Sequence, residues 1–137
     1  MGIPQRHLDQ WLHNRKFVSL IPATHPDWIV TVSFYVALHA VDALLQSDGV
    51  RRVNSHDSRN EVLMNTRRYT RIWDAYQPLH DLSRRIRYLA DPLQWITFED
   101  IPKQVFRRYL YPIEESVYRL MAGPHTHVDI PLQKPGE

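Results

Sequence analysis

The stretch NSHDSRNEV (54–62) places a histidine and an arginine three positions apart, where a loop turns into a helix. The positive end of a helix dipole lowers the pKa of a histidine at the N-terminus and favours the neutral imidazole, which can act as a base. An arginine one turn later can hold a phosphate oxygen while that base takes a proton. His56 and Arg59 are therefore the candidate catalytic pair of a ribonuclease. The alternative is that His56 helps to cap the helix and Arg59 pairs with Asp57 or a neighbouring acid.

A second polar group combines His39 and Asp42 on one face of an expected helix, with Tyr35 one turn earlier. An aspartate can orient an imidazole, as in hydrolase triads. The chain has no cysteine, however, and no serine elbow of the type G-x-S-x-G. The group is therefore more typical of a hydrogen-bonded polar pair that faces another helix, with its partner expected among Tyr69, Tyr76 and Arg59.

Two segments interleave arginine with tyrosine, RRYTR (67–71) and SRRIRY (83–88). Cations beside aromatic rings suit single-stranded RNA or stacking on a nucleotide. The alternative is a solvated helix face whose arginine stems cover apolar surface. We favour the solvated face for Arg67, Arg68 and Arg85. The full set of expected binding residues is Tyr35, His39, Asp42, Arg51, Arg52, Tyr76, His80, Arg84 and Arg87.

No motif for a metal or a cofactor stands out. His125 and His127 form an H-x-H pair with only Asp129 nearby, and the chain has neither HExxH nor Glu-x-x-His. We expect no metal site and no cofactor.

The composition is that of one globular domain: 137 residues, 43% hydrophobic and 23% charged, so disorder is not the default expectation. Without cysteine the chain forms neither disulfides nor thiolate zinc sites, which fits a reducing cytoplasm. We expect a soluble cytoplasmic protein that does not bind membranes, because no apolar run approaches the roughly 20 residues needed to span a bilayer. Arginine supplies 14 of the 17 basic residues, yet a net charge of +2 alone supports only weak nucleic-acid binding.

Helical periodicity predicts an all-α fold. The expected helices cover residues 5–18, 27–47, a stretch from 55 or 58 to about 90 with a break near 66–70, and 98–121. Proline breakers are expected to kink the third stretch at Pro78 and to bend or split the last one at Pro112. Caps are expected from Thr24 or Asp27, from a capping box of Ser58 with Glu61 or of Ser55 one turn earlier, from Thr97 with Asp100, and from Gly49 and Gly123.

These elements predict an up-and-down four-helix bundle over residues 27–122. It is preceded by a short helix and linker (1–26) and followed by an extended tail (123–137). Two of its helices carry a core stripe, which is Val30, Phe34, Ala37, Val41 and Leu44 on one helix and Ile72, Ala75, Leu79, Leu82, Ile86 and Leu89 on the other. Each of these helices also has a second face that is both aromatic and polar. The second faces are Trp28, Val32, Tyr35, His39 and Asp42 on one helix, and Tyr69, Trp73, Tyr76, His80, Ser83 and Arg87 on the other. Such faces indicate a partner or a ligand.

Three separated patterns resemble the HEPN domains (higher eukaryotes and prokaryotes nucleotide-binding): DWIVTVSFYVALHAVDALL, SHDSRNEV and YQPLHDLSRRIRY. The resemblance covers about residues 27–121. It implies a helical bundle that pairs into a homodimer and binds RNA or a nucleotide. Many HEPN proteins are metal-independent ribonucleases, some of them toxins held by a nucleotidyltransferase-type antitoxin, whereas others are non-catalytic interaction modules.

The catalytic members of that family carry R-x(4–6)-H near the start of a late bundle helix. Here this spacing occurs only at Arg6–His13, Arg51–His56 and Arg119–His125, none of which lies in that place. We therefore expect binding rather than cleavage. If the chain does cleave RNA, we expect His56 as the base and Arg59 as the phosphate clamp, helped by Arg51 or Arg52.

Overall fold

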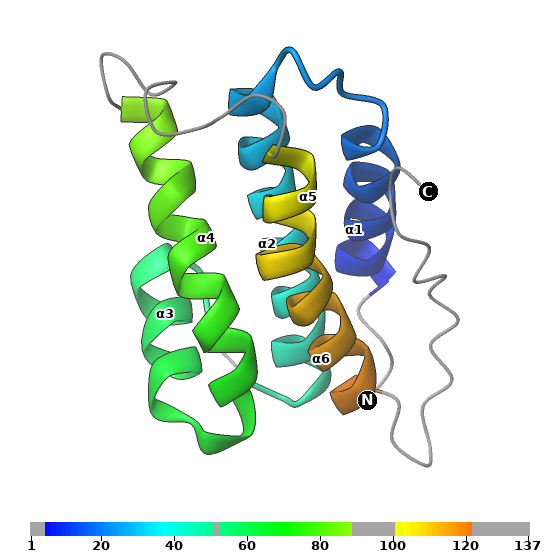
Figure 1. Cartoon of the computed structure of the whole chain (residues 1–137). Coiled ribbons are helices and arrows are strands. Elements are labelled where there is room, and N and C mark those ends of the chain that lie inside the picture. The colour runs from blue at the N-terminus through cyan, green and yellow to red at the C-terminus, as the bar shows by residue number, and fades with distance from the viewer. Residues whose placement is uncertain (1–4, 51–52, 89–100, 122–137) are drawn as a thin grey trace.

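The computed structural model describes residues 5–50, 53–88 and 101–121. Every regular element within these ranges is helical, which confirms the all-α class. The elements are α1 (Gln5–Val18), α2 (Pro26–Ser47), α3 (His56–Asn65), the 3-10 turn η1 (Arg67–Tyr69), α4 (Thr70–Tyr88), α5 (Ile101–Val105), the π-helical turn η3 (Phe106–Leu110) and α6 (Tyr111–Met121). Figure 1 shows a helical bundle in which α3 lies beside α4.

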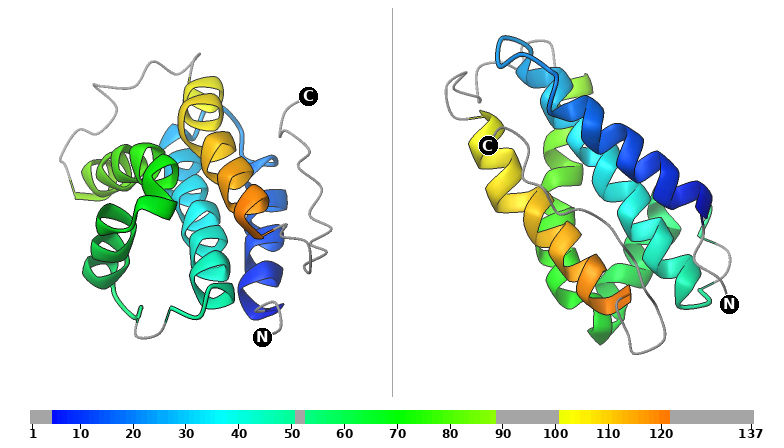
Figure 2. Two further views of the ribbon diagram at one scale, coloured as in Figure 1. Left: turned by 90° about the horizontal axis from the view of Figure 1, so that it is seen from below. Right: turned by 90° about the vertical axis from the view of Figure 1, so that its right-hand side faces the viewer.

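Helix α2 lies at the centre of the bundle, between α1 on one side and α4 and α6 on the other (Figures 1 and 2). Its core stripe is fully buried, and Val36, Ala40 and Ala43 between the stripe residues are buried as well. By length and composition α2 does qualify as a possible membrane span, with a mean hydropathy of 1.7 over its best window, so the expectation that no run comes near this limit was wrong. Because 72% of that window is buried by the other helices, α2 has the surroundings of a core helix.

The two ends of α2 are made differently. At its start neither Thr24 nor Asp27 acts as the cap, contrary to expectation: His25 occupies that position without a side-chain hydrogen bond, and Pro26 begins the helix. Proline suits this place because its missing N–H would have had no partner there. At its end Gly49 adopts φ 80°, and the N–H groups of Gly49 and Val50 return to the carbonyls of Gln46 and Leu45. These bonds form the expected glycine stop.

Helix α3 begins with a capping box at Ser55. The Ser55 side chain accepts from the Ser58 N–H, and the Ser58 hydroxyl accepts from the Ser55 N–H, both at 3.1 Å. Of the two starts that the sequence allowed, the earlier one forms, so Ser58 is inside the helix and is not its cap. The box makes His56 the first helical residue, and the next turn begins with Arg59.

The break near residues 66–70 is confirmed as η1, after which α4 continues through Pro78. The last helix, expected to bend or split at Pro112, stays helical and widens into a π-turn immediately before this proline. The Tyr111 N–H donates to the Phe106 carbonyl five residues earlier, which makes this turn a π-helix. The widened turn precedes the proline because Pro112 has no N–H for the carbonyl four residues back and its ring crowds that carbonyl.

One hydrophobic core runs through all the long helices, α1 included. Leu8, Trp11 and Val18 of α1 belong to it. The Glu114 carboxylate on α6 accepts from Trp11 Nε1 and from Arg15 Nε, both at 2.7 Å and both buried. The N-terminal helix is therefore pinned to the last helix by an interior ion pair.

Candidate functional site

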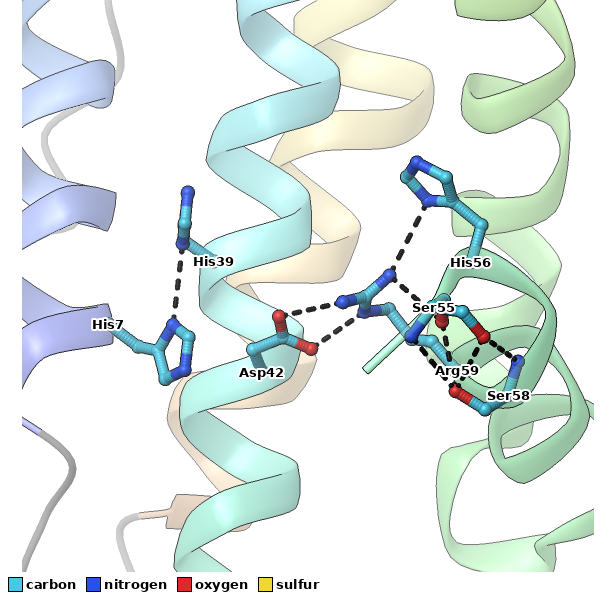
Figure 3. Close-up of polar contacts among 7 residues, drawn as sticks. All are labelled: His7, His39, Asp42, Ser55, His56, Ser58 and Arg59. Carbon is cyan, nitrogen blue, oxygen red and sulfur yellow. Dashed lines mark hydrogen bonds and ion pairs between the residues drawn. The ribbon is translucent and has the colours of Figure 1, made fainter. Parts of the chain in front are cut away.

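The centre of the candidate site is a buried ion pair between α2 and α3. Arg59 Nε lies 2.6 Å from Asp42 Oδ1 and Arg59 Nη2 lies 2.9 Å from Asp42 Oδ2, so the contact is bidentate (Figure 3). The two side chains are only 7% and 11% exposed. The third guanidinium nitrogen, Nη1, points to the Ser55 carbonyl at 3.5 Å and to His56 Nδ1 at 3.4 Å. Arg59 thus joins α3 to α2 and also steadies the start of α3.

His56 is exposed at the rim, above this ion pair. Its ring lies against Phe34 and His80, with centroids 5.8 and 4.9 Å away. Partial burial and the nearby positive charges of Arg59 and Arg87 lower the pKa of His56, and together they outweigh the opposite effect of Asp42. The lowered pKa favours the neutral imidazole, which is the state that a base requires.

Beneath His56 lies a floor of stacked rings. His80 is 7% exposed and lies flat on Phe34, with centroids 4.8 Å apart and planes 8° apart. Tyr76, completely buried, packs against both rings, with centroids 5.6 Å from Phe34 and 6.0 Å from His80. Burial, followed by the charges of His56 and of the surrounding arginines, lowers the pKa of His80 to about 4. The second face of α4 is therefore largely an interior surface.

Several polar atoms in this part of the fold are buried without a hydrogen-bond partner among the described residues. They are Ser33 Oγ, Asn60 Oδ1, Tyr76 OH and Ser83 Oγ. The Asn60 amide nitrogen does have a contact, with His80 Nδ1 at 3.3 Å. The Tyr76 hydroxyl lies close to the Arg59 guanidinium without the geometry of a full hydrogen bond, and burial raises the pKa of Tyr76. Because each such atom costs free energy when unpaired, their concentration around α2, α3 and α4 marks a polar interior that packing alone does not explain.

The rim of the site is basic. Arg87 is partly buried: it donates from Nη1 to the Tyr35 hydroxyl at 3.3 Å and from Nε to the Ser83 carbonyl at 3.3 Å. Tyr35 is 36% exposed. Arg84 is exposed, and its charge is among those that lower the pKa of His80. Tyr35, Arg84 and Arg87 therefore surround the same ring floor from α2 and α4.

His39 lies apart from this group. Its Nδ1 atom is 3.4 Å from His7 Nδ1 on α1, on the side of α2 away from Arg59 (Figure 3). The expected polar face of α2 is therefore shared between two neighbours. Asp42 contacts Arg59 on α3, whereas His39 contacts His7 on α1. Arg51 and Arg52 lie outside the described residues.

No known protein family, curated protein or solved structure matches this chain. The fold brings together the following predicted site residues: Tyr35, Asp42, His56, Arg59, Tyr76, His80, Arg84 and Arg87.

Three contributors were not predicted from the sequence. Phe34 was assigned to the core stripe, and it is also the ring on which His56 and His80 pack. Asn60 was not singled out, although its position beside Arg59 is the signal that could have found it. His7 was not singled out either, because its partner His39 is 32 residues away.

Arg67, Arg68 and Arg85, the arginines expected on a solvated face, are all exposed, and Arg68 and Arg85 form ion pairs at the surface. Arg68 binds Asp48 through Nε at 2.9 Å and also donates to the Leu120 carbonyl at 3.0 Å. Arg85 pairs with Asp81 at 3.0 Å, one turn away. The Arg68 contacts link η1 to the end of α2 and to α6, whereas the Arg85 contact lies within α4. Neither residue belongs to the ring floor.

Proposed function

We propose that this chain is a HEPN-like domain that binds RNA or a nucleotide through the basic rim over the α2–α3–α4 ring floor. The observation that carries the proposal is the excess of positive charge at this rim. The charges of Arg84 and Arg87 both act on His80, whereas the charge of Arg59 is compensated by Asp42. A phosphate would compensate that charge, and exposed aromatic edges beside it suit a base.

Within this proposal, the exposed residues bind and the buried ones position. Arg84 and the partly exposed pair of Arg87 with Tyr35 would contact phosphate and base. Arg59 would act through His56, because two of its three nitrogens are held by Asp42. This division favours binding over cleavage. For cleavage, Arg59 would have to hold the phosphate through Nη1 alone, or release Asp42 and bind the phosphate in its place.

The test measures fluorescence anisotropy of a labelled single-stranded RNA and of a labelled adenine nucleotide as a function of salt. Arg84→Ala should weaken binding and reduce the slope of log affinity against log salt by roughly one phosphate contact. The control is Arg119→Ala, an exposed arginine on α6 that pairs with Glu115. Equal losses for the two variants, or no binding by the parent protein, would refute the assignment.

Cleavage is tested separately, with total RNA and with tRNA in the presence of EDTA. Loss of cleavage in both His56→Ala and Arg59→Ala would identify a metal-independent ribonuclease. Loss in Arg59→Ala alone would make Arg59 essential and His56 dispensable. Intact RNA with the parent protein leaves binding as the function.

A second candidate function is a non-catalytic interaction module. The observation in its favour is an apolar groove of about 430 Å³ where α1 turns into α2, lined by Phe17, Leu20, Ile21, Pro22, His25 and Trp28. Phe17, Leu20 and Trp28 are 50%, 72% and 58% exposed, which is unusual for a cluster of large apolar side chains on a monomer. A homodimer, or an antitoxin of the nucleotidyltransferase type, would cover this surface. Sedimentation equilibrium of the protein and of Trp28→Ser tests the homodimer: a monomeric parent protein rules it out.

A further inference from the structure

The two histidines that face each other across α1 and α2 form an arrangement independent of the nucleotide site. His7 Nδ1 and His39 Nδ1 are 3.4 Å apart, and the ring centroids are 5.7 Å apart with planes tilted by 33°. Both side chains are partly buried. Among the described residues neither imidazole forms another hydrogen bond or an ion pair. Figure 3 shows the two Nδ1 atoms pointing toward one another.

A hydrogen bond explains this contact poorly. Hydrogen bonds from N–H groups in proteins cluster near 2.9–3.0 Å, and at 3.4 Å the attraction is weak. The distance is also close to that between two nitrogen ligands of one metal ion. Two imidazole nitrogens, each about 2.0–2.1 Å from a tetrahedral zinc ion, lie about 3.3–3.4 Å from each other. The separation is therefore the one that a bidentate site needs. Because the two nitrogens face each other nearly head-on, each ring would turn about its side-chain bonds to bring its lone pair onto the ion.

We propose that His7 and His39 form a two-histidine site for a borderline divalent ion such as Zn²⁺ or Cu²⁺, which would cross-link α1 to α2. Imidazole suits these ions, whereas Mg²⁺ and Ca²⁺ prefer oxygen ligands. The described residues hold no group of three or more histidine, aspartate or glutamate side chains that could enclose a metal. The remaining coordination positions are therefore filled by water or by an external ligand, and binding is weaker than in a closed structural zinc site.

The charges around the pair act in both directions. The negative charge of Asp42, one turn beyond His39, attracts a cation toward the site. The positive charges of Arg59 and Arg6 oppose it. Because Arg59 neutralises Asp42, the imidazole lone pairs supply most of the affinity. The site therefore selects for ions that favour nitrogen ligands over ions attracted by charge alone.

The test is calorimetric titration of the full-length protein with zinc chloride at neutral pH. The tail pair His125 and His127 has the H-x-H spacing of a competing site, so all measurements use a background in which both are glutamine. We expect one zinc ion per chain in this background. His7→Gln and His39→Gln should each weaken binding by at least about tenfold, because a single imidazole remains. His13→Gln, which removes an exposed histidine of the same helix, should leave binding unchanged.

Two further measurements keep the proposal falsifiable if a variant folds poorly. In the folded background, zinc should shift the ¹⁵N resonances of the Nδ1 atoms of His7 and His39 in particular. Zinc should also raise the Tm of the background and not that of His7→Gln, because the ion joins two helices. Zinc binding that is unaltered in both His7→Gln and His39→Gln, or resonance shifts confined to other histidines, would overturn the proposal.

Discussion

Removing the carboxylate of Asp42 should destabilise the protein strongly, because the Arg59 guanidinium would be left buried without a counter-ion. Breaking one partner of a buried ion pair costs about 3–5 kcal/mol, whereas exposed pairs contribute about 0–1 kcal/mol. The two side chains are 7% and 11% exposed, so the buried figure applies, toward its lower end. We expect Asp42→Ala to lower the free energy of unfolding by about 3 kcal/mol, which is roughly a 150-fold change in the folding equilibrium.

The assay is urea denaturation of four proteins: the parent, Asp42→Ala, Arg59→Met and the double variant. The double variant should recover part of the loss, with a coupling energy of about 2 kcal/mol, because removing both charges leaves none to bury. Glu115→Ala is the matched control. Glu115 forms an ion pair with Arg119 in which the two side chains are 64% and 60% exposed, respectively. We therefore expect a loss below about 1 kcal/mol. A loss for Asp42→Ala as small as that of the control, or additive single variants, would refute the argument.

Three further predictions concern the elements that hold the site. As the pH falls from 6.5 to about 4, His80 should lower the free energy of unfolding by about 2 to 3 kcal/mol, because the unfolded chain protonates His80 in this range while the folded protein, with a pKa near 4, does not. The urea midpoint of His80→Gln should therefore depend less on pH than that of the parent protein. Ser55→Ala should cost about 1 kcal/mol by removing the α3 cap, seen as a lower Tm, with Ser116→Ala, a partly exposed serine in the interior of α6, as control. Gly49→Ala should cost about 1 kcal/mol in chemical denaturation because a Cβ is disfavoured at φ 80°, and a smaller loss for Gly49→Asn would agree with that cause.

The helices could be predicted from the sequence because their signals are local. Apolar residues at helical spacing, Gly49 at the end of α2 and Pro112 in the last helix each act over one or two turns. Where two local signals compete, the sequence does not decide between them. Ser55 and Ser58 both offer a capping oxygen, and the earlier start forms with each serine serving the other. The cap of α2 was mispredicted because Pro26, which has no N–H, occupies the first helical position and makes His25 the residue before the helix.

The site was predicted less completely because burial depends on how the helices pack. Arg59 was expected to pair with a nearby acid or to hold phosphate, and Asp42 was among the residues expected to face it. That their contact is nearly sealed follows from where α3 rests on α4, which no local pattern encodes. For the same reason His39 was grouped with Asp42, although it faces α1. Tyr76 and His80 share one stripe on α4, yet the ring floor they form exists only because Phe34 comes from α2.

The anchoring of α3 has a consequence for local stability. Of its ten residues only Arg59 and Leu63 are buried, so one of the two anchors of this helix is a charged side chain. A segment with so little apolar contact opens at a lower free energy than the core helices do, as a unit of its own. Such an opening would separate Arg59 from Asp42 and uncover the His80 face together. Exchange of the α3 amides with solvent therefore reports directly on the integrity of the site, and a ligand that bridges α3 and α4 slows it.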